Sequence, residues 1–447
     1  MFLKKSVYNI EVDRLDKGDI LIFNSLTSAF GIMNCATQEL YNGIENINID
    51  SITEKSIKEN IDVMKSNGFL VNEDIDEFER IKLLSRFARY KNNNLSIAIA
   101  PTMNCNMACP YCYEDKTSHR INTETKELLI KFIENYIVTQ NIKYFSVTWY
   151  GGEPLLELKT IQDISKEFID ICKKSGAVYN SGIITNGSLL DYTTAKLLIE
   201  ECNVSRAQIT IDGFKETHNK RRILKNGLDS FQIIIDNIDS IKDILPIVVR
   251  INVDKSNADE ISNMINYFIT DKGWKNTVKF YLSPVFARTN ETYDFDSSFC
   301  LTEKEFSEID TWIINDLSLR EDSNILGDLY PKSRLIYCGA LKYNFYAVDP
   351  NGYLYTCWEN VGKTQLNVGN VKDGVLFNKN FINWLTTDLP NNCMKCNMLP
   401  LCQGGCPHNR ISYGVEPKCE HIIFNCKENL KAVYKNYRKT QGITNAI

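Results

Sequence analysis

The chain has 447 residues, of which 43% are hydrophobic and 24% charged, so wholesale disorder and fibrous repeats are excluded. At about 150 residues per domain, this length predicts about three domains. The formal net charge of −5 is too balanced for a generic nucleic-acid binder. No stretch approaches about 18 uncharged apolar residues, so we expect no membrane span. The N-terminal segment reaches Asp13 before an apolar signal core forms, which favours a cytoplasmic location.

Residues 1–90 have the pattern of a small winged-helix-like module. This module carries 11 Lys/Arg and 15 Asp/Glu, a net charge of −4, which argues against contacts with DNA phosphates. We therefore predict a peptide-docking module rather than a DNA-binding one. Strands are predicted at 8–12, 20–23 and 69–71, and helices near 36–41, from Thr53 and as a link within 80–94.

From residue 95 onward, short apolar or β-branched runs alternate with amphipathic helical patterns. The predicted strands are 95–100, 145–150, 182–185, 207–211, 247–253 and 278–282, and the helices between them are 123–137, 161–172, 192–201, 231–241 and 258–268. Six βα units in series predict an α/β fold with a parallel sheet, open or partly closed as a barrel. In such folds the chemistry lies at the carboxyl ends of the strands.

The last quarter of the chain has fewer long periodic segments. Predicted strands at 344–348 and 353–355 flank Asp349-Pro350-Asn351-Gly352, which is a strong hairpin-turn sequence. A final amphipathic helix is predicted at 427–437. The cysteine-bearing loops at 393–406 are too loop-rich to fold alone, so we expect a metal to stabilise them.

The unusual feature of the composition is 15 Cys against only 4 His. In a large cytoplasmic chain this favours thiolate metal ligands over disulfides. Cys105, Cys109 and Cys112 follow the first βα strand with the spacing C-x3-C-x2-C. Three thiolates can hold three irons of a [4Fe–4S] cluster and leave the fourth iron open to a small molecule. Zinc is the alternative, but structural zinc needs four ligands, and no His or fourth Cys lies nearby.

A three-cysteine loop at the end of strand 1 resembles that of radical S-adenosylmethionine (SAM) enzymes. Gly151-Gly152-Glu153-Pro154, after strand 2, is similar to the family's GGEP motif, although these residues also suit a plain strand-to-helix turn. The resemblance implies that Glu153 pairs with the SAM ammonium and that Gly151 and Gly152 let the backbone approach a ligand. It also implies these SAM contacts: Tyr111 beside the adenine, Thr185 and Asn186 at the ribose, Arg222 rather than Arg221 at the carboxylate, and Asn252, which otherwise stands at the core edge.

The mechanism implied by this resemblance begins at the open iron, which chelates SAM through its amino and carboxylate groups. Reductive cleavage then releases methionine and a 5′-deoxyadenosyl radical, which abstracts hydrogen from an unactivated carbon. The protein positions the cofactor and excludes water and oxygen. No residue of the sequence is assigned as a catalytic base.

The C-terminal cysteines match the pattern of the SPASM extension of radical SAM enzymes. A paired zinc ribbon is the alternative. The resemblance implies two auxiliary [4Fe–4S] clusters, and therefore three clusters in the chain. One takes Cys338, Cys357, Cys406 and a fourth ligand that stays open between Cys419, Cys300 and an iron left for substrate sulfur; the other takes Cys393, Cys396, Cys402 and Cys426.

The predicted domains follow from these motifs. They are 1–90, a winged-helix-like module for peptide (leader) recognition; 91–290, a partial (β/α)6 radical SAM barrel; 291–330, a linker or bridging helix; and 331–447, a SPASM auxiliary-cluster domain.

SPASM enzymes mostly modify peptides, and the acidic first module resembles the leader-binding element of enzymes that mature ribosomally made peptides (RiPPs). We therefore expect a maturase that forms thioether or related cross-links in a precursor peptide, with a ferredoxin or flavodoxin as electron donor. One alternative is a formylglycine-generating sulfatase maturase, which usually has an Asp base after the second SPASM cysteine, where this chain has Trp358. A metal-stabilised binding protein without catalysis is the other alternative.

Overall fold

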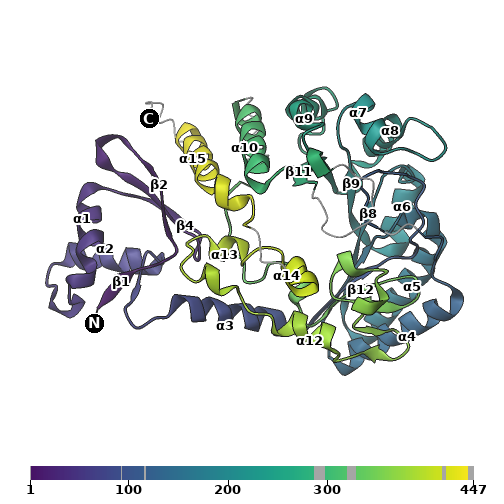
Figure 1. Cartoon of the computed structure of the whole chain (residues 1–447), viewed down its shortest axis with the longest axis horizontal. Coiled ribbons are helices and arrows are strands. Elements are labelled where there is room, and N and C mark those ends of the chain that lie inside the picture. Colours follow the sequence, from purple (N-terminus) through teal and green to yellow (C-terminus); the bar gives the residue numbers. More distant parts are fainter. Residues whose placement is uncertain are drawn as a thin grey trace. The chain divides into compact units, whose positions relative to one another are not determined.

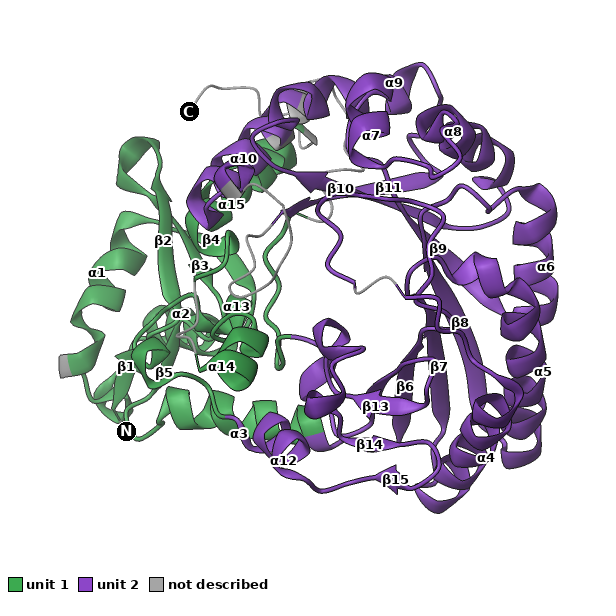
Figure 2. Cartoon of the chain, turned by 45° about the vertical axis from the view of Figure 1, so that its right-hand side comes forward, with its two compact units in different colours: residues 1–89, 325–337, 388–447 green, residues 90–324, 338–387 purple. Residues whose placement is uncertain are grey.

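The computed structural model describes residues 2–91, 93–114, 117–285, 297–319, 329–414 and 419–440. The chain forms two compact units, each assembled from segments far apart in the sequence (Figure 2). Unit 1 contains residues 1–89, 325–337 and 388–447, and unit 2 contains residues 90–324 and 338–387. The boundaries predicted at residues 90, 290 and 330 stay predictions.

Unit 2 is built on a sheet of ten strands in the order β11-β10-β9-β8-β7-β6-β12-β13-β14-β15. Figure 1 labels β8, β9, β11 and β12 of this sheet. Its parallel strands are β6 (Asn94–Ile99), β7 (Tyr144–Trp149), β8 (Val178–Thr185), β9 (Val204–Thr210), β10 (Ile247–Val253) and β11 (Val278–Pro284). Because β6 to β11 pair in parallel, their carboxyl ends lie along one edge of the sheet. The predicted α/β fold with six βα units is confirmed.

The helices of the βα units lie along one side of this sheet (Figure 2). They are α4 (Thr123–Thr139), α5 (Leu158–Ser175), α6 (Tyr192–Cys202), α7 (Lys215–Arg221), α8 (Ser230–Ile241) and α9 (Ile261–Thr270), followed by α10 (Glu303–Leu319). Alternation along β7 explains this layering, because Phe145 points to the helices and contacts Phe168 of α5, with ring centroids 5.1 Å apart. Ser146 and Thr148, on the opposite face, stay partly exposed. Of the predicted linker, residues 291–296 and 320–328 lie outside the described residues.

Four further strands extend the sheet beyond β6. They are β12 (Phe345–Val348), β13 (Tyr353–Tyr355), β14 (Gly369–Asn370) and β15 (Gly374–Val375), followed by α12 (Lys379–Thr386). Strand β12 pairs in parallel with β6 and antiparallel with β13, so the predicted hairpin is present and joins the main sheet. Asp349 accepts a backbone hydrogen bond from Asn351, and Gly352 has φ +82°, as a turn at this point requires.

Unit 1 contains a three-stranded antiparallel sheet, β2-β3-β4, and a separate β1-β5 pair. Its elements are β1 (Leu3–Lys5), β2 (Asn9–Arg14), β3 (Ile20–Asn24), β4 (Ala29–Met33), α1 (Cys35–Gly43), α2 (Lys55–Ser66), β5 (Leu70–Asn72), α3 (Glu77–Tyr90), α13 (Leu399–Cys402), α14 (Pro407–Tyr413) and α15 (Ile422–Thr440). The sequence pattern did not predict β1, which is short and charged, or β4, which contains Gly31.

Strand β3 is buried on both faces, which explains its uninterrupted apolar run. Ile20 and Ile22 belong to a core with Ile61 of α2, while the alternate residues Leu21 and Phe23 face a second core. The second core includes residues of β2, α13 and α15: Ile10, Val12, Leu401, Cys426 and Leu430. The N-terminal module and the C-terminal cysteine segment therefore share one hydrophobic core.

No helix in the described ranges combines the length and the apolar character needed to cross a membrane.

Candidate functional site

The loop with Cys105, Cys109 and Cys112 follows β6 and is held on two sides. Cys105 is buried and the other two are half-buried, and none is in a disulfide. The Met103 amide donates to the carbonyl of His119 at 3.0 Å. The Ala108 amide donates to the carbonyl of Ile223 at 2.8 Å, just past α7. Three cysteine side chains are thereby placed at the carboxyl edge of the parallel sheet.

Gly151 and Gly152 let the end of β7 approach the cysteine loop closely. A Cβ on Gly151, whose φ is +116°, would lie 2.5 Å from the Thr102 carbonyl oxygen. A Cβ on Gly152 would lie 2.3 Å from the Asn104 carbonyl oxygen. Real Cβ atoms do not tolerate such distances from backbone, so both positions need glycine. In this structure the partner in the close approach is the loop itself, whereas the sequence predicted a ligand.

Glu153 ties the ends of β7 and β8 together. It is fully buried and accepts hydrogen bonds from the Thr185 hydroxyl at 2.7 Å and from the Asn186 amide at 2.8 Å. Burial raises the pKa of its carboxyl above the ordinary value, and the bonds from Asn186 and Thr185 oppose that rise. Asn186 also reaches the cysteine loop, because its Nδ2 donates to Asn106 Oδ1 at 2.8 Å and lies 3.9 Å from Cys105 Sγ. Three of the predicted SAM-binding residues therefore adjoin the predicted iron ligands.

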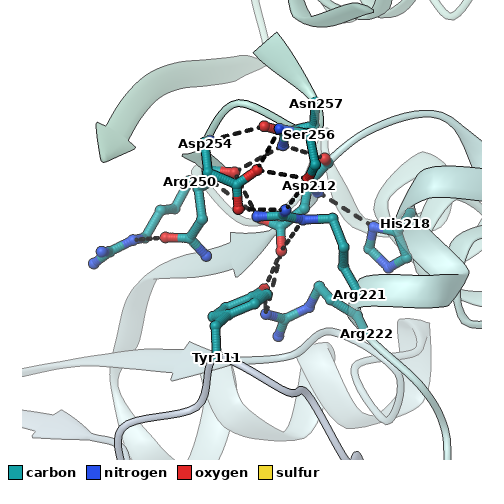
Figure 3. A network of polar contacts seen from close by, with 10 residues as sticks. Tyr111, Asp212, His218, Arg221, Arg222, Arg250, Asp254, Ser256 and Asn257 are labelled. Carbon is teal, nitrogen blue, oxygen red and sulfur yellow. Dashed lines mark hydrogen bonds and ion pairs between the residues drawn. The ribbon is translucent and has the colours of Figure 1, made fainter. Parts of the chain in front are cut away.

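A buried polar network follows the ends of β9 and β10 (Figure 3). At its centre the fully buried Asp212 accepts hydrogen bonds from the Tyr111 hydroxyl and from the Asn252 amide. Tyr111 comes from the cysteine loop, so Asp212 connects that loop to the sheet. The Tyr111 hydroxyl also accepts a hydrogen bond from Arg222 Nη1 at 3.1 Å. The network thus brings Tyr111, Arg222 and Asn252 together, and their role as SAM contacts stays a prediction.

The two neighbouring arginines have different surroundings. Arg221 Nη1 donates to Asp254 Oδ2 at 2.6 Å and to Ser256 Oγ at 2.9 Å. The Arg221 guanidinium also lies over the Tyr111 ring, 5.1 Å from its centroid. The Nε atoms of Arg221 and Arg222 are both buried and have no hydrogen-bond partner within the described part of the chain. Arg221 donates to the protein through both of its Nη atoms, whereas Arg222 donates through Nη1 to Tyr111, so Arg222 has more donors left for a ligand carboxylate. The choice of Arg222 over Arg221 as the contact to SAM stays a prediction.

Sequence reasoning missed the acidic members of this network. The sequence pattern predicts no role for Asp212 or Asp254. Arg221 and Asp254 lie 33 positions apart, so no local spacing shows their pairing. The available signal was weaker: an acidic residue stands just past each of two adjacent strand ends, where charged groups meet in parallel sheets.

The C-terminal cysteines divide between the two units. Cys338 and Cys357 belong to unit 2, and the other six belong to unit 1: Cys393, Cys396, Cys402, Cys406, Cys419 and Cys426. Burial raises the pKa of the Cys402 thiol to about 11 and that of Cys426 to about 12. Cys426 lies in the core that α15 shares with β2 and β3. The assignment of these residues to two auxiliary clusters stays a prediction.

The fit to an iron–sulfur cluster rests on the chemistry of the donors. Within the described ranges, no three His, Cys, Asp or Glu side chains are already arranged to hold a metal ion. The loop after β6 nevertheless offers three thiols within eight residues, and none of the fifteen cysteines, all of which lie in the described ranges, is in a disulfide. Thiolates are the ligands that iron–sulfur clusters take. The residues present fit a cluster held by Cys105, Cys109 and Cys112, with SAM beside it.

Comparison with known proteins agrees with this geometry. Residues 99–268 match the model of the Radical SAM superfamily. A serine-type anaerobic sulfatase-maturating enzyme of Bacteroides thetaiotaomicron is 26% identical over 353 residues, which cover 69% of this chain and 81% of that protein.

Two solved structures show the same fold. The structure of anSMEcpe with bound AdoMet has a TM-score of 0.59 at 20% identity and covers 77% of this chain and 99% of its own. Streptococcus suis SuiB bound to the precursor peptide SuiA has a TM-score of 0.51 at 15% identity and covers 94% of this chain and 99% of its own.

Proposed function

We propose that this chain, an enzyme of the radical SAM class with its radical SAM domain at residues 99–268, forms thioether or related cross-links in a ribosomally made precursor peptide. The observation that carries the proposal is the convergence of three cysteine thiols outside disulfides, Glu153 and Arg222 at one edge of a parallel sheet. The class implies SAM and a [4Fe–4S] cluster; the reduced cluster would supply one electron to the SAM sulfonium, which gives the site its radical chemistry.

The residues of this chain bind and orient these groups. Cys105, Cys109 and Cys112 hold the cluster. Arg222 receives the methionine carboxylate, because Arg221 is bonded to the protein through both of its Nη atoms, whereas Arg222 donates through Nη1 to Tyr111 and has a buried Nε without a partner in the described structure. Glu153 receives the ammonium, because an ionised carboxylate accepts more hydrogen bonds than the three it already has. Thr185 and Asn186 adjoin the ribose, and Tyr111 and Asn252 complete the SAM contacts.

The N-terminal module supports a peptide substrate. In the three-stranded sheet β3 is central and β2 and β4 are the two edge strands; because β2 contacts α15, we choose β4 as the edge for a further strand. An extended leader peptide would add to β4 by main-chain hydrogen bonds, and docking there would raise the effective concentration of the core peptide to roughly millimolar. SuiB, whose structure with a precursor peptide covers 94% of this chain, has a similar fold. The proposed auxiliary clusters and a ferredoxin or flavodoxin donor complete the electron path.

A formylglycine-generating sulfatase maturase is the second candidate, favoured by the likeness to the Bacteroides enzyme. Its expected base would stand at Trp358. Here Trp358 packs against Tyr150, with ring centroids 4.9 Å apart, and stacks on Phe345 at 6.3 Å. An indole cannot serve as a proton acceptor of this kind, so this position favours the cross-linking function.

Replacing Cys105, Cys109 and Cys112 together with Ala tests the proposed cluster. The anaerobic variant should form no 5′-deoxyadenosine with dithionite, and its iron content should fall by about four per chain because one cubane is lost. The control is Cys172→Ala, at a cysteine outside the clustered ones. This variant should retain both its iron content and its formation of 5′-deoxyadenosine. Undiminished 5′-deoxyadenosine from the triple variant would contradict the proposal. Incubation with the precursor encoded beside the gene should remove two hydrogens per cross-link, and activity on a sulfatase peptide alone would favour the second candidate.

A further inference from the structure

Two charge pairs are buried where the cysteine loop meets β9 and β10. Asp212 and Asp254 are 0% and 1% exposed, and Arg221 and Arg222 are 8% and 9% exposed. Two carboxylates therefore balance two guanidinium groups almost without water. In such surroundings the carboxylate that each arginine pairs with decides which donors remain available to a ligand.

Asp254 and its neighbours bind the guanidinium of Arg221. Its Oδ2 accepts from Arg221 Nη1 at 2.6 Å, and its Oδ1 accepts from the amide and hydroxyl of Ser256, which also binds Arg221. Arg221 Nη2 donates to the Asn252 carbonyl at 3.3 Å. The short loop after β10 thus surrounds one guanidinium with acceptors. Figure 3 shows Asp254, Ser256 and Asn257 grouped at one end of the network.

Tyr111 separates Arg222 from the remaining carboxylate. The Tyr111 hydroxyl donates to Asp212 and offers its lone pair to Arg222 Nη1. Arg222 Nη1 is 4.0 Å from Asp212, so this ion pair is long. Arg222 therefore approaches the centre through a neutral hydroxyl, whereas Arg221 is bonded directly to a carboxylate. Arg222 is left with the donor capacity that a ligand can use.

We infer that Asp254 is a positioning residue: by accepting the hydrogen bond from Arg221 Nη1, it keeps Arg221 from bonding directly to Asp212 and the Tyr111 hydroxyl and leaves Arg222 for the carboxylate of SAM. This inference rests on the proposed function for the contact between Arg222 and SAM. Without the Asp254 charge, Arg221 would turn to Asp212, which it already approaches to 3.9 Å, and would disturb the Tyr111–Arg222 contact. If both charges of the Asp254–Arg221 pair are removed, the Arg221 guanidinium no longer competes with Arg222 for Asp212 and Tyr111.

The test measures SAM affinity by equilibrium dialysis on the iron-loaded, anaerobic enzyme. Asp254→Asn should weaken SAM binding about tenfold or more, because the affected contact is a charge-assisted one. The double variant Arg221→Gln/Asp254→Asn should recover to within about threefold of the wild type, because no uncompensated guanidinium remains. Asp239→Asn is the matched control, since Asp239 is also ion-paired, with Lys272 at 2.6 Å, and lies outside the network. It should not change SAM affinity.

Recovery in the double variant distinguishes positioning from a merely structural need for Asp254. If Asp254→Asn binds SAM as the wild type does, or if the double variant binds as weakly as the single one, the inference is wrong. If Asp254→Asn does not fold, the double variant Arg221→Gln/Asp254→Asn still tests the inference. The inference is wrong if the double variant binds SAM as weakly as Arg222→Gln does. Arg222→Gln also separates the two proposals, since unchanged affinity there would contradict the SAM contact of Arg222 itself.

Discussion

Gly152 marks the closest approach between the cysteine loop and the end of β7. Its Cβ would also lie 2.6 Å from the Met103 carbonyl oxygen, and backbone atoms cannot rotate away as a side chain can. Glu153 follows immediately and fixes this turn to β8 through Thr185. A single residue without a side chain thus sets the position of the loop that carries the thiols.

Gly152→Ala should therefore act on the cysteine loop. The added methyl group forces the backbone of the loop to shift, at about 1–3 kcal/mol for overpacking. Iron bound by the loop and 5′-deoxyadenosine formation should both fall, and both are measured on anaerobic protein. Gly43→Ala is the control, because no atom lies within 4 Å of its Cβ position. Wild-type iron content and rate in Gly152→Ala would show that the loop position does not depend on this contact.

At the scale of elements, the positions of Arg221 and Arg222 depend on how α7 is joined to α8. Asp229 caps α8 by accepting from the Gln232 amide at 3.1 Å. It also accepts from Asn219 of α7 at 2.8 Å and pairs with Lys215 Nζ at 2.7 Å. Hydrogen bonding to Lys215 lowers the pKa of Asp229 to about 2, and the bond from Asn219 adds to this. One carboxylate therefore fixes the helix that ends at Arg221.

Asp229→Ala should lower the free energy of unfolding by about 1 kcal/mol through loss of the cap. A carboxyl whose folded pKa is lowered stabilises above its unfolded value of 3.8, and this contribution disappears as the pH falls towards about 2. The difference in melting temperature between Asp229→Ala and the wild type should thus be constant from about pH 5 to 8. Asp229→Asn, which keeps a cap, should lose less. A difference that varies across this range would contradict the assigned cause.

The sequence predicted the helices and strands better than the side-chain contacts between them. Strand 247–253 was predicted within the bounds observed for β10, because its β-branched residues are buried in a parallel sheet. The strand-end residues Glu153 and Asn186 came together as predicted because parallel strands end on one edge. The Arg221–Asp254 pair could not be predicted, since ion pairs between distant loops leave no periodic pattern. Charged β1 also lacks the apolar alternation by which strands are recognised.

At the scale of the whole molecule, unit 1 unites the two ends of the chain. Tyr8, Phe78 and Ile81 share a core with Leu389 and Leu399. The cluster that contains Cys426 likewise includes residues of β2 and β3. Deleting residues 1–90 would therefore expose the core that supports the C-terminal cysteines, and such a truncated enzyme would lose more than peptide docking. A test of docking needs a point substitution on the exposed edge strand.

Ile32 of β4 offers that test, because its side chain is 52% exposed and lies outside the buried cores. Ile32→Asp should weaken precursor binding about tenfold, since it places a charge where an added strand would pack its side chains. SAM cleavage without peptide should be unchanged, because the proposed cluster ligands Cys105, Cys109 and Cys112 lie in unit 2. Val138→Asp, at a 66% exposed position of α4, is the matched control. Affinity is measured by titration with labelled precursor and cross-linking by mass loss. If Ile32→Asp binds and modifies the precursor as the wild type does, the leader does not dock on β4.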